Sequence, residues 1–150
     1  MATFRERPYG RGNFLVDLGN GDTESPQAAF VEVILPEALI EAHEYRAGNE
    51  RSNEPRKLIG GVGYGNVVLK RGLLGALDLY EWWNQARNGD AGAYRNVLIQ
   101  LLSEDRQTVA LTWRLRNAFP VRHAFSELAA NACEPAIEVL ELAVERIDLE

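Results

Sequence analysis

Alternation of apolar and polar side chains dominates this sequence, and it is clearest at residues 108–116. One set of alternate positions there is apolar and consists of Val109, Leu111, Trp113 and Leu115, with Thr, Ala and Arg residues between them. Successive side chains of a strand point to opposite faces, so a period of two predicts a β-strand. We expect its apolar face to be buried and its other face to meet solvent or another subunit.

Five further strands are expected around this one. Residues 94–102 are apolar at both sets of alternate positions, which predicts a central strand, and the polar link 103–106 predicts a short hairpin loop. Segments 14–18, 28–35 and 64–71 are predicted strands, the first ending at a Gly-Asn-Gly turn and the last at Gly72. At 137–144 the apolar phase shifts by one residue, which predicts either a β-bulge near Val139–Leu140 or burial of both faces.

One helix is predicted, over residues 76–88. Its apolar positions are spaced i, i+3, i+4 and i+7 and are Ala76, Leu79, Tyr80 and Trp83, with Trp82 widening the stripe. Gly89 follows as a C-terminal stop. We expect Leu79, Tyr80, Trp82 and Trp83 to pack against the sheet or a neighbouring subunit, rather than to form a stacking platform for bases or sugars.

Composition narrows the class of protein. With 150 residues, of which 46% are hydrophobic and 25% charged, the chain suits a single soluble domain. Seven carboxylates and one arginine follow residue 126, so the whole net charge of −6 lies there, which argues against a protein that coats nucleic acid. The single cysteine, Cys133, excludes an internal disulfide and is expected to be buried.

No apolar run is long enough to span a membrane, and the N-terminus has no signal-peptide core, so we expect no membrane insertion and assembly in the cytoplasm.

The sequence offers no convincing catalytic residues. The glycine-rich run 60–65 leads into a strand instead of a helix N-terminus, which disfavours a phosphate-binding loop. His43 and His123 have no metal-ligand spacing around them, and the serines lack a nucleophile motif. We therefore expect no enzyme activity, no cofactor and no metal.

Several short signatures in a fixed order carry a resemblance. They are 56–58 (Arg-Lys-Leu), 64–72 (Tyr-Gly-Asn-Val-Val-Leu-Lys-Arg-Gly), 79–83 (Leu-Tyr-Glu-Trp-Trp), Trp113, 117–120 (Asn-Ala-Phe-Pro) and 137–142 (Ile-Glu-Val-Leu-Glu-Leu). Together they resemble the inner tube proteins of contractile phage tails and contractile injection systems, a family that is related to the tube protein of type VI secretion. The resemblance covers residues 9 to 147.

The resemblance implies a fold and a function. The fold is mainly β (α+β): an antiparallel β-barrel or sandwich with one flanking helix, an N-terminal arm (1–11) and a long stacking loop (46–57). The function is structural: six copies form a ring, rings stack head to tail, and the lumen passes DNA or protein cargo. Implied partners are the sheath, the baseplate or tube-initiator proteins and the tail terminator, in a virion tail or an extracellular contractile particle.

The resemblance also bears on residues 37–57. Local propensity at 37–46 favours a helix, whereas the resemblance implies an extended strand, and we follow the latter. The polar segment 47–55 then reaches the adjacent ring, where charged side chains contact an acidic surface such as that of the C-terminal strand. The expected ring-stacking residues are Leu39, Tyr45, Arg46, Arg51, Arg56 and Lys57.

The chain departs from the family after its second strand, where Leu35-Pro36-Glu37-Ala38-Leu39 replaces a Ser-Gly-Leu-like turn. A tube-initiating or capping paralogue near the baseplate is therefore an alternative, and a separately secreted ring-shaped cargo carrier is another. The sequence does not decide between a phage and an injection system.

Overall fold

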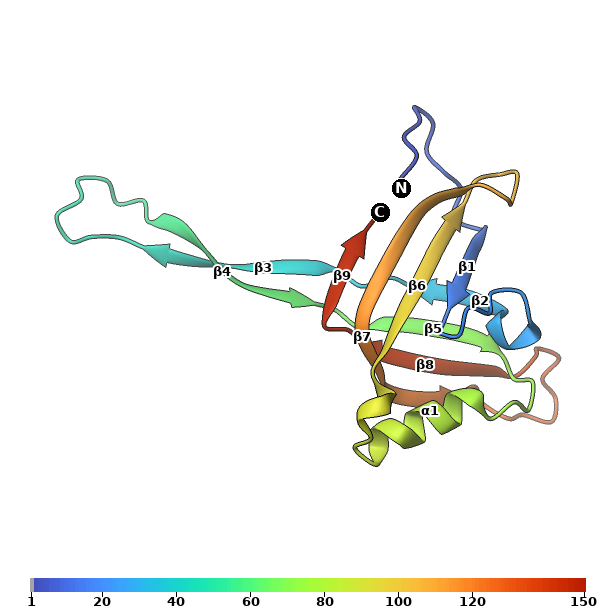
Figure 1. Ribbon diagram of the computed structural model, residues 1–150. Coiled ribbons are helices and arrows are strands. Elements are labelled where there is room, and N and C mark those ends of the chain that lie inside the picture. The colour runs from blue at the N-terminus through green and yellow to red at the C-terminus, as the bar shows by residue number, and fades with distance from the viewer. Residues whose placement is uncertain (1) are drawn as a thin grey trace.

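The computed structural model describes residues 2–150 and is built mainly of antiparallel strands (Figure 1). The strands are β1 (Phe14–Asp17), β2 (Phe30–Ile34), β3 (Ala38–Tyr45), β4 (Arg56–Tyr64), β5 (Val67–Gly72), β6 (Arg95–Leu102), β7 (Val109–Phe125), β8 (Ile137–Ala143) and β9 (Arg146–Leu149). The α-helix is α1 (Asp78–Arg87), and short 3-10 helices lie at Pro26–Ala28 and Ala91–Ala93. This confirms the mainly β fold with one flanking helix.

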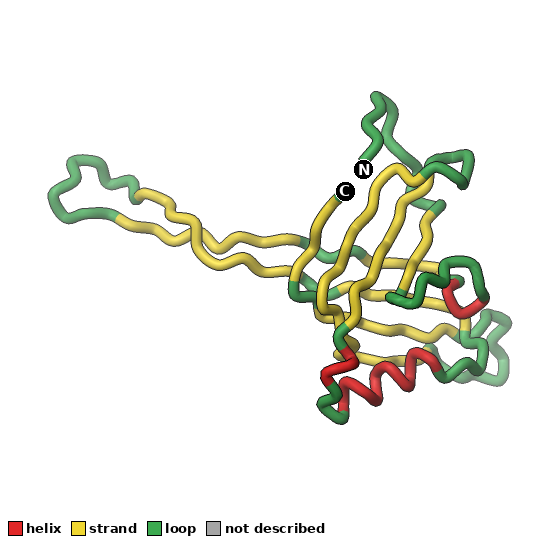
Figure 2. The backbone as a smooth tube through the Cα atoms, viewed as in Figure 1, coloured by secondary structure: helices red, strands yellow, loops and turns green. Residues whose placement is uncertain are grey.

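The long strand β7 connects two halves of one bent sheet, whose order is β1-β6-β7-β8-β5-β2. The first half of β7 pairs with β6 on one side and β9 on the other, and its second half pairs with β8. Asn117 has a positive φ of 50° where the strand changes partners, a conformation that Asn tolerates better than most residues. The two half-sheets pack across a common core as a sandwich, and α1 packs against β7 (Figure 2).

Residues 38–45 are extended, as the resemblance implied, because β3 pairs along its length with β4 and this pairing overrides a weak helical propensity. Two other strand predictions were wrong in their bounds. The strand expected at 64–71 is interrupted, with Tyr64 ending β4 and Val67 beginning β5. The strand expected at 108–116 continues to Phe125.

Of the two alternatives for 137–144, the bulge near Val139–Leu140 is absent from β8, whose pairing with β5 is regular, and one face is buried while the other is half-buried. The bulge lies instead on the partner strand β7, between Pro120 and Arg122. The apolar phase of β8 shifts because Glu138 occupies a buried position in line with Leu140 and Leu142. Cys133, expected to be buried, is exposed in the loop between β7 and β8.

Helix α1 presents a different face to the core than the sequence predicts. Leu79 and Trp82 are fully buried, whereas Trp83 is half-buried and Tyr80 is 43% exposed. The indole N–H of Trp82 donates to the carbonyl oxygen of Ala93 at 2.7 Å, so the one polar atom of this buried side chain has a hydrogen-bond partner. Trp83 lies instead under the guanidinium of Arg87. Gly89, with φ 73°, ends the helix as predicted.

A buried ionic cluster joins α1 to the sheet. Arg71 is fully buried, and its guanidinium donates to Glu138 (3.1 Å) and to Asp78 in the first turn of α1 (2.6 Å). His123 Nε2 lies 2.7 Å from the other oxygen of Glu138. Burial lowers the pKa of Arg71, but the hydrogen bonds and charges of the two carboxylates outweigh it and raise that pKa overall. The sequence did not predict this cluster, because its members come from β5, α1, β7 and β8.

The N-terminal segment is held against the loop between β6 and β7. The guanidinium of Arg5 makes two hydrogen bonds to the carboxylate of Glu104, at 2.6 and 2.7 Å, and lies 3.8 Å from the centre of the Tyr9 ring. Hydrogen bonding from Arg5 lowers the pKa of Glu104 to about 2. A carboxyl with a lowered pKa in the folded state favours that state above its ordinary pKa, and the benefit is lost as the pH falls through about 2.

We therefore expect Arg5→Ala to raise the pKa of Glu104 from about 2 toward its ordinary value of 4.5. Carbon-detected NMR titration of the side-chain carboxyl measures it. Arg7→Ala is the control, because Arg7 contributes only its backbone oxygen to the Arg5 side chain. An unchanged pKa of Glu104 in Arg5→Ala would contradict the conclusion that the hydrogen bonds from Arg5 lower this pKa.

Candidate assembly surfaces

The β3–β4 arm, residues 38–64, projects from the sandwich as a two-stranded ribbon (Figure 1). Every side chain of β3 is exposed, and β4 is exposed except at Gly60 and Tyr64, which are half-buried. No residue of the arm belongs to the core cluster of the described chain. Two-stranded hairpins are marginal in water, so an arm of this length is suited to packing on another molecule.

The structure brings five of the six predicted stacking residues to the distal end of the arm. Tyr45 ends β3, Arg56 and Lys57 begin β4, and Arg46 and Arg51 lie in the tip between the strands. Leu39 lies instead near the root. The segment predicted as a loop over 46–57 is thus a hairpin tip flanked by strands, because 56 and 57 pair with 45 and 44.

Hydrogen bonds within the tip hold its shape. Arg46 donates from Nε to the carbonyl oxygen of Ser52 at 2.8 Å and from a terminal nitrogen to that of Glu50 at 2.9 Å. The Glu50 carboxylate lies 3.6 Å from Arg56 Nε. Two of the positively charged side chains of the tip, Arg46 and Arg56, therefore interact with other groups of the tip itself.

The root of the arm is fixed to the body. The N–H of Gly65 donates to the carbonyl oxygen of Glu37 at 2.9 Å, and Ala38 pairs with Tyr64 as the first pair of the ribbon. A Cβ on Gly65 would lie 3.4 Å from the backbone nitrogen of Glu37, so the two chains approach closely here. Because Glu37 follows β2 and Gly65 precedes β5, this contact fixes the orientation of the arm relative to these two strands.

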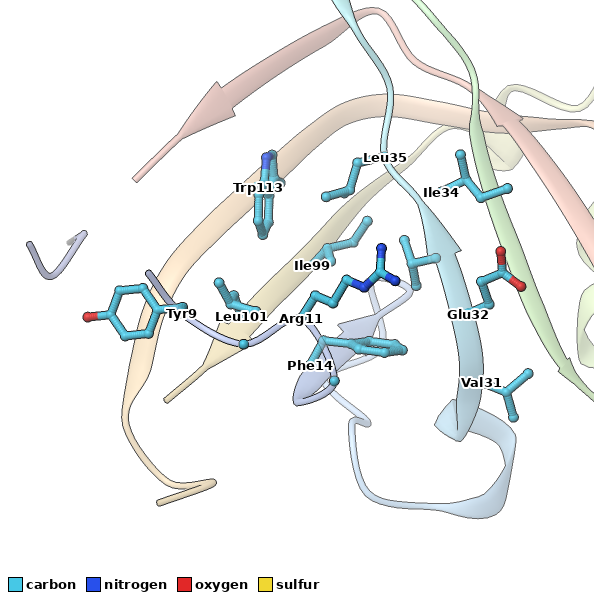
Figure 3. A pocket seen from close by; sticks show the side chains of 13 residues that line it. Tyr9, Arg11, Phe14, Val31, Glu32, Ile34, Leu35, Ile99, Leu101 and Trp113 are labelled. Atoms are coloured by element: carbon cyan, nitrogen blue, oxygen red, sulfur yellow. The ribbon is translucent and has the colours of Figure 1, made fainter. Parts of the chain in front are cut away.

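An open groove of about 690 Å³ lies between the edge strands β1 and β2 (Figure 3). Apolar side chains line most of it, including Phe14, Val33, Ile99 and Trp113, and Arg11 of the N-terminal segment reaches into it. Of the face predicted to be buried, Leu115 is buried, while Val109, Leu111 and Trp113 are only half-buried. Trp113 is accessible because the groove lies over it.

The two half-sheets have free edges. In the half formed by β1, β6, β7 and β9, strands β1 and β9 each have one partner among the described strands. In the other half, β2 pairs only with β5. Free edges present unpaired N–H and C=O groups that a strand of another chain can complete.

Over residues 2–150, no helix is both long and apolar enough to cross a membrane. In the same range, no cluster of three or more His, Cys, Asp or Glu side chains is arranged to hold a metal ion.

Comparison with known proteins places this fold. Residues 11–148 match the family described as T4-like virus tail tube protein gp19. A chain from the cryo-EM structure of the anti-feeding prophage baseplate is 27% identical, with a TM-score of 0.80 and 97% of each chain covered. A chain of the sheath–tube complex of the extracellular contractile injection system PVC is 22% identical, with a TM-score of 0.83, covering 97% of this chain and 93% of that one.

A more distant structure has the same fold. Hcp1 from Flavobacterium johnsoniae is 12% identical, with a TM-score of 0.52, covering 91% of this chain and 93% of Hcp1. The curated protein sequences contained no match to the chain. The match over residues 11–148 includes both half-sheets, the β3–β4 arm and α1, and the chain therefore belongs to the T4-like tail tube protein family, as a structural tube subunit.

Proposed function

We propose that six copies of this chain close into a ring and that the rings stack head to tail into the hollow inner tube of a contractile particle. The observation that carries the proposal is a pair of free edges, β1 and β9, on opposite sides of one half-sheet. Pairing of β9 in one copy with β1 in the next joins two different edges, which makes the interface heterologous. Each added copy therefore offers a free edge to the next, and repetition about a rotation axis closes a ring.

The β3–β4 arm makes the contacts between rings in this proposal. Over residues 2–150 none of its side chains joins the core, and it projects well beyond the sandwich (Figure 1). Leu39, Tyr45, Arg46, Arg51, Arg56 and Lys57 meet the neighbouring ring. The cationic tip suits an acidic surface, although exposed ion pairs are each worth only about 0–1 kcal/mol.

The polar face of the half-sheet with β9 is the proposed lumen wall. Its charges are largely paired: Arg114 and Arg116 of β7 donate across to Glu150 (3.0 Å) and Asp148, and Arg146 donates to Asp148 within β9. Paired charges leave little net field, so a polyanion or a protein can pass without being held. The chain acts mechanically in this proposal, as part of a rigid conduit, and carries out no chemical reaction.

The sheath, baseplate and terminator proteins are the further proposed partners. The similar chains come from the anti-feeding prophage baseplate and from the sheath–tube complex of an extracellular contractile injection system. These relatives support a location in a virion tail or an extracellular particle, and we propose that the subunits assemble in the cytoplasm beforehand.

A second candidate function is that of a tube initiator close to the baseplate. The 27% identity to a chain of the anti-feeding prophage baseplate favours it. The Leu35-Pro36-Glu37 link also lies at the root of the arm, between β2 and β3, where a changed turn would alter the arm's direction. An initiator forms rings and seeds a tube, whereas a principal subunit elongates it.

Ring formation tests the proposal directly. Purified protein at micromolar concentration is expected to give a six-subunit species of about 101 kDa by mass photometry, from a 16.8 kDa chain. Negative-stain microscopy is expected to show rings and, at higher concentration, tubes. A purely monomeric species with no rings on the grids would contradict it.

A further inference from the structure

The two faces of the β3–β4 arm differ in chemistry. Register places Ala38 opposite Tyr64, Ile40 opposite Val62 and Ala42 opposite Ile59, and residues two apart on β3 share a face. We call this set the apolar face: Ala38, Ile40, Ala42, Ile59, Val62 and Tyr64. The opposite face is mixed, with Leu39, Glu41, His43, Tyr45, Arg56 and Leu58.

A β-bulge makes the apolar face continuous. Between the pairs Ile40–Val62 and Ala42–Ile59, β3 advances by two residues and β4 by three, which leaves one extra residue in the Gly60–Gly61 step. Without it, Ile59 would stand opposite His43 on the mixed face, because a slip of one residue turns a strand over. The bulge therefore brings Ile59 onto the same face as Ile40 and Val62.

Only glycine fits at position 60. A Cβ there would lie 2.4 Å from Cδ2 of His43 and 2.8 Å from the carbonyl oxygen of Glu41. The second contact is with the backbone of the paired strand β3, so the clash could be removed only by a shift of the two strands relative to each other. Gly63, three residues along the same strand, has no atom within 4 Å of the equivalent position.

The apolar face is open to solvent. Ile40 is 62% exposed, Val62 60% and Ile59 85%. The next pair on this face toward the tip, Glu44 and Lys57, carries opposite charges on opposed positions and adds no net charge to the face. A neutral apolar stripe on a ribbon that is marginal alone suits an apolar protein surface better than a polyanion.

A second copy of this chain is the partner that the structure favours. A tube subunit meets another copy at each end of its ring, and the body of this chain presents an apolar groove between β1 and β2 (Figure 3). Val31 and Val33 of β2 are among the residues that line it. We propose that the apolar face of the arm binds a second copy of this chain in the next ring, with Gly60 as the residue that positions Ile59 in that face. This rests on the stacking role proposed above.

The first test compares neighbours on opposite faces. Ile59→Asn is expected to lower the fraction of protein in sedimentable tubes by about tenfold or more, since full burial of an isoleucine contributes about that factor. Leu58→Asn, on the mixed face where Leu39, Tyr45 and Arg56 contribute the other proposed contacts, is expected to lower this fraction by only about twofold. Both variants should retain rings, because neither residue is buried in the body. Wild-type tubes from Ile59→Asn, or an equal loss in Leu58→Asn, would overturn the proposal.

The second test addresses Gly60. Gly60→Ala is expected to form rings but few tubes, while Gly63→Ala assembles like wild type. Equal assembly of the two alanine variants would overturn the positioning role. A variant without the arm distinguishes the stacking role of the arm from the role of its apolar face. Tubes from the armless protein would overturn the stacking role itself. Tubes from Ile59→Asn but not from the armless protein would overturn only the assignment to the apolar face.

Discussion

Removing the β3–β4 arm is expected to leave the subunit folded and its rings closed, and to abolish tubes. The variant replaces residues 39–63 by a two- or three-residue Asn-Gly type turn between Ala38 and Tyr64. These two residues are paired, and opposed Cα atoms of antiparallel strands lie about 4.5–5.5 Å apart, so a short turn can join them. No residue of the deleted segment belongs to the core, and the proposed ring contacts involve β1 and β9.

Electron microscopy and mass photometry of this variant give the answer. We expect six-subunit rings at the wild-type level, and no tubes under conditions in which the wild type forms them. Thermal unfolding is expected within a few degrees of wild type, which would show that the body is intact. Tubes of normal length would mean that the arm does not stack rings, and loss of rings would mean that it also takes part in ring closure.

Trp82→Ala is expected to destabilise the subunit by about 3–5 kcal/mol, the usual range for truncating a buried large aromatic residue. Trp82 is fully buried and donates to the Ala93 carbonyl, so the variant also leaves that buried acceptor without its partner. Domains of this size are typically stable by about 5–15 kcal/mol, so the loss removes much of the margin and soluble protein should fall sharply.

Trp83→Ala is the matched control, because it removes the same side chain one position along the same helix. Trp83 is half-buried and its cation–π contact with Arg87 is worth about 0.5–1 kcal/mol, so we expect a loss of about 1–2 kcal/mol. Urea unfolding followed by circular dichroism measures both variants. Equal losses of stability, or a larger loss for Trp83→Ala, would instead support the helix orientation that the periodicity of Ala76, Leu79, Tyr80 and Trp83 predicts, with Trp83 in the core.

The helix shows where prediction from the sequence stops. Leu79, the approximate span of α1 and the stop at Gly89 follow from local periodicity and glycine chemistry, and the structure agrees. The rotation of the helix does not follow, because adjacent tryptophans allow two apolar stripes. The choice is made by contacts from distant segments: the Ala93 carbonyl and the Arg95 guanidinium both meet the Trp82 ring.

The candidate assembly surface shows the same division. A polar, exposed segment at 47–55 was readable from composition, and the extended conformation of 38–45 was implied by resemblance. The apolar face of the arm was not readable, since Ile40 and Ile59 share a face only through an extra residue at Gly60 and Gly61. A glycine-rich run indicates that a bulge is allowed, but the pairing register decides where it lies.

The sequence by itself determined the alternating strands, the single helix, the exposed segment and the tube-protein family, because each depends on local spacing or on short signatures along the chain. Only the tertiary structure decided the rotation of α1, the bulge in the arm and the buried cluster of Arg71, Glu138, Asp78 and His123. The physical reason is that these features depend on pairing partners far apart in the chain: Arg71 and Glu138 are separated by 67 residues and meet because β5 pairs with β8.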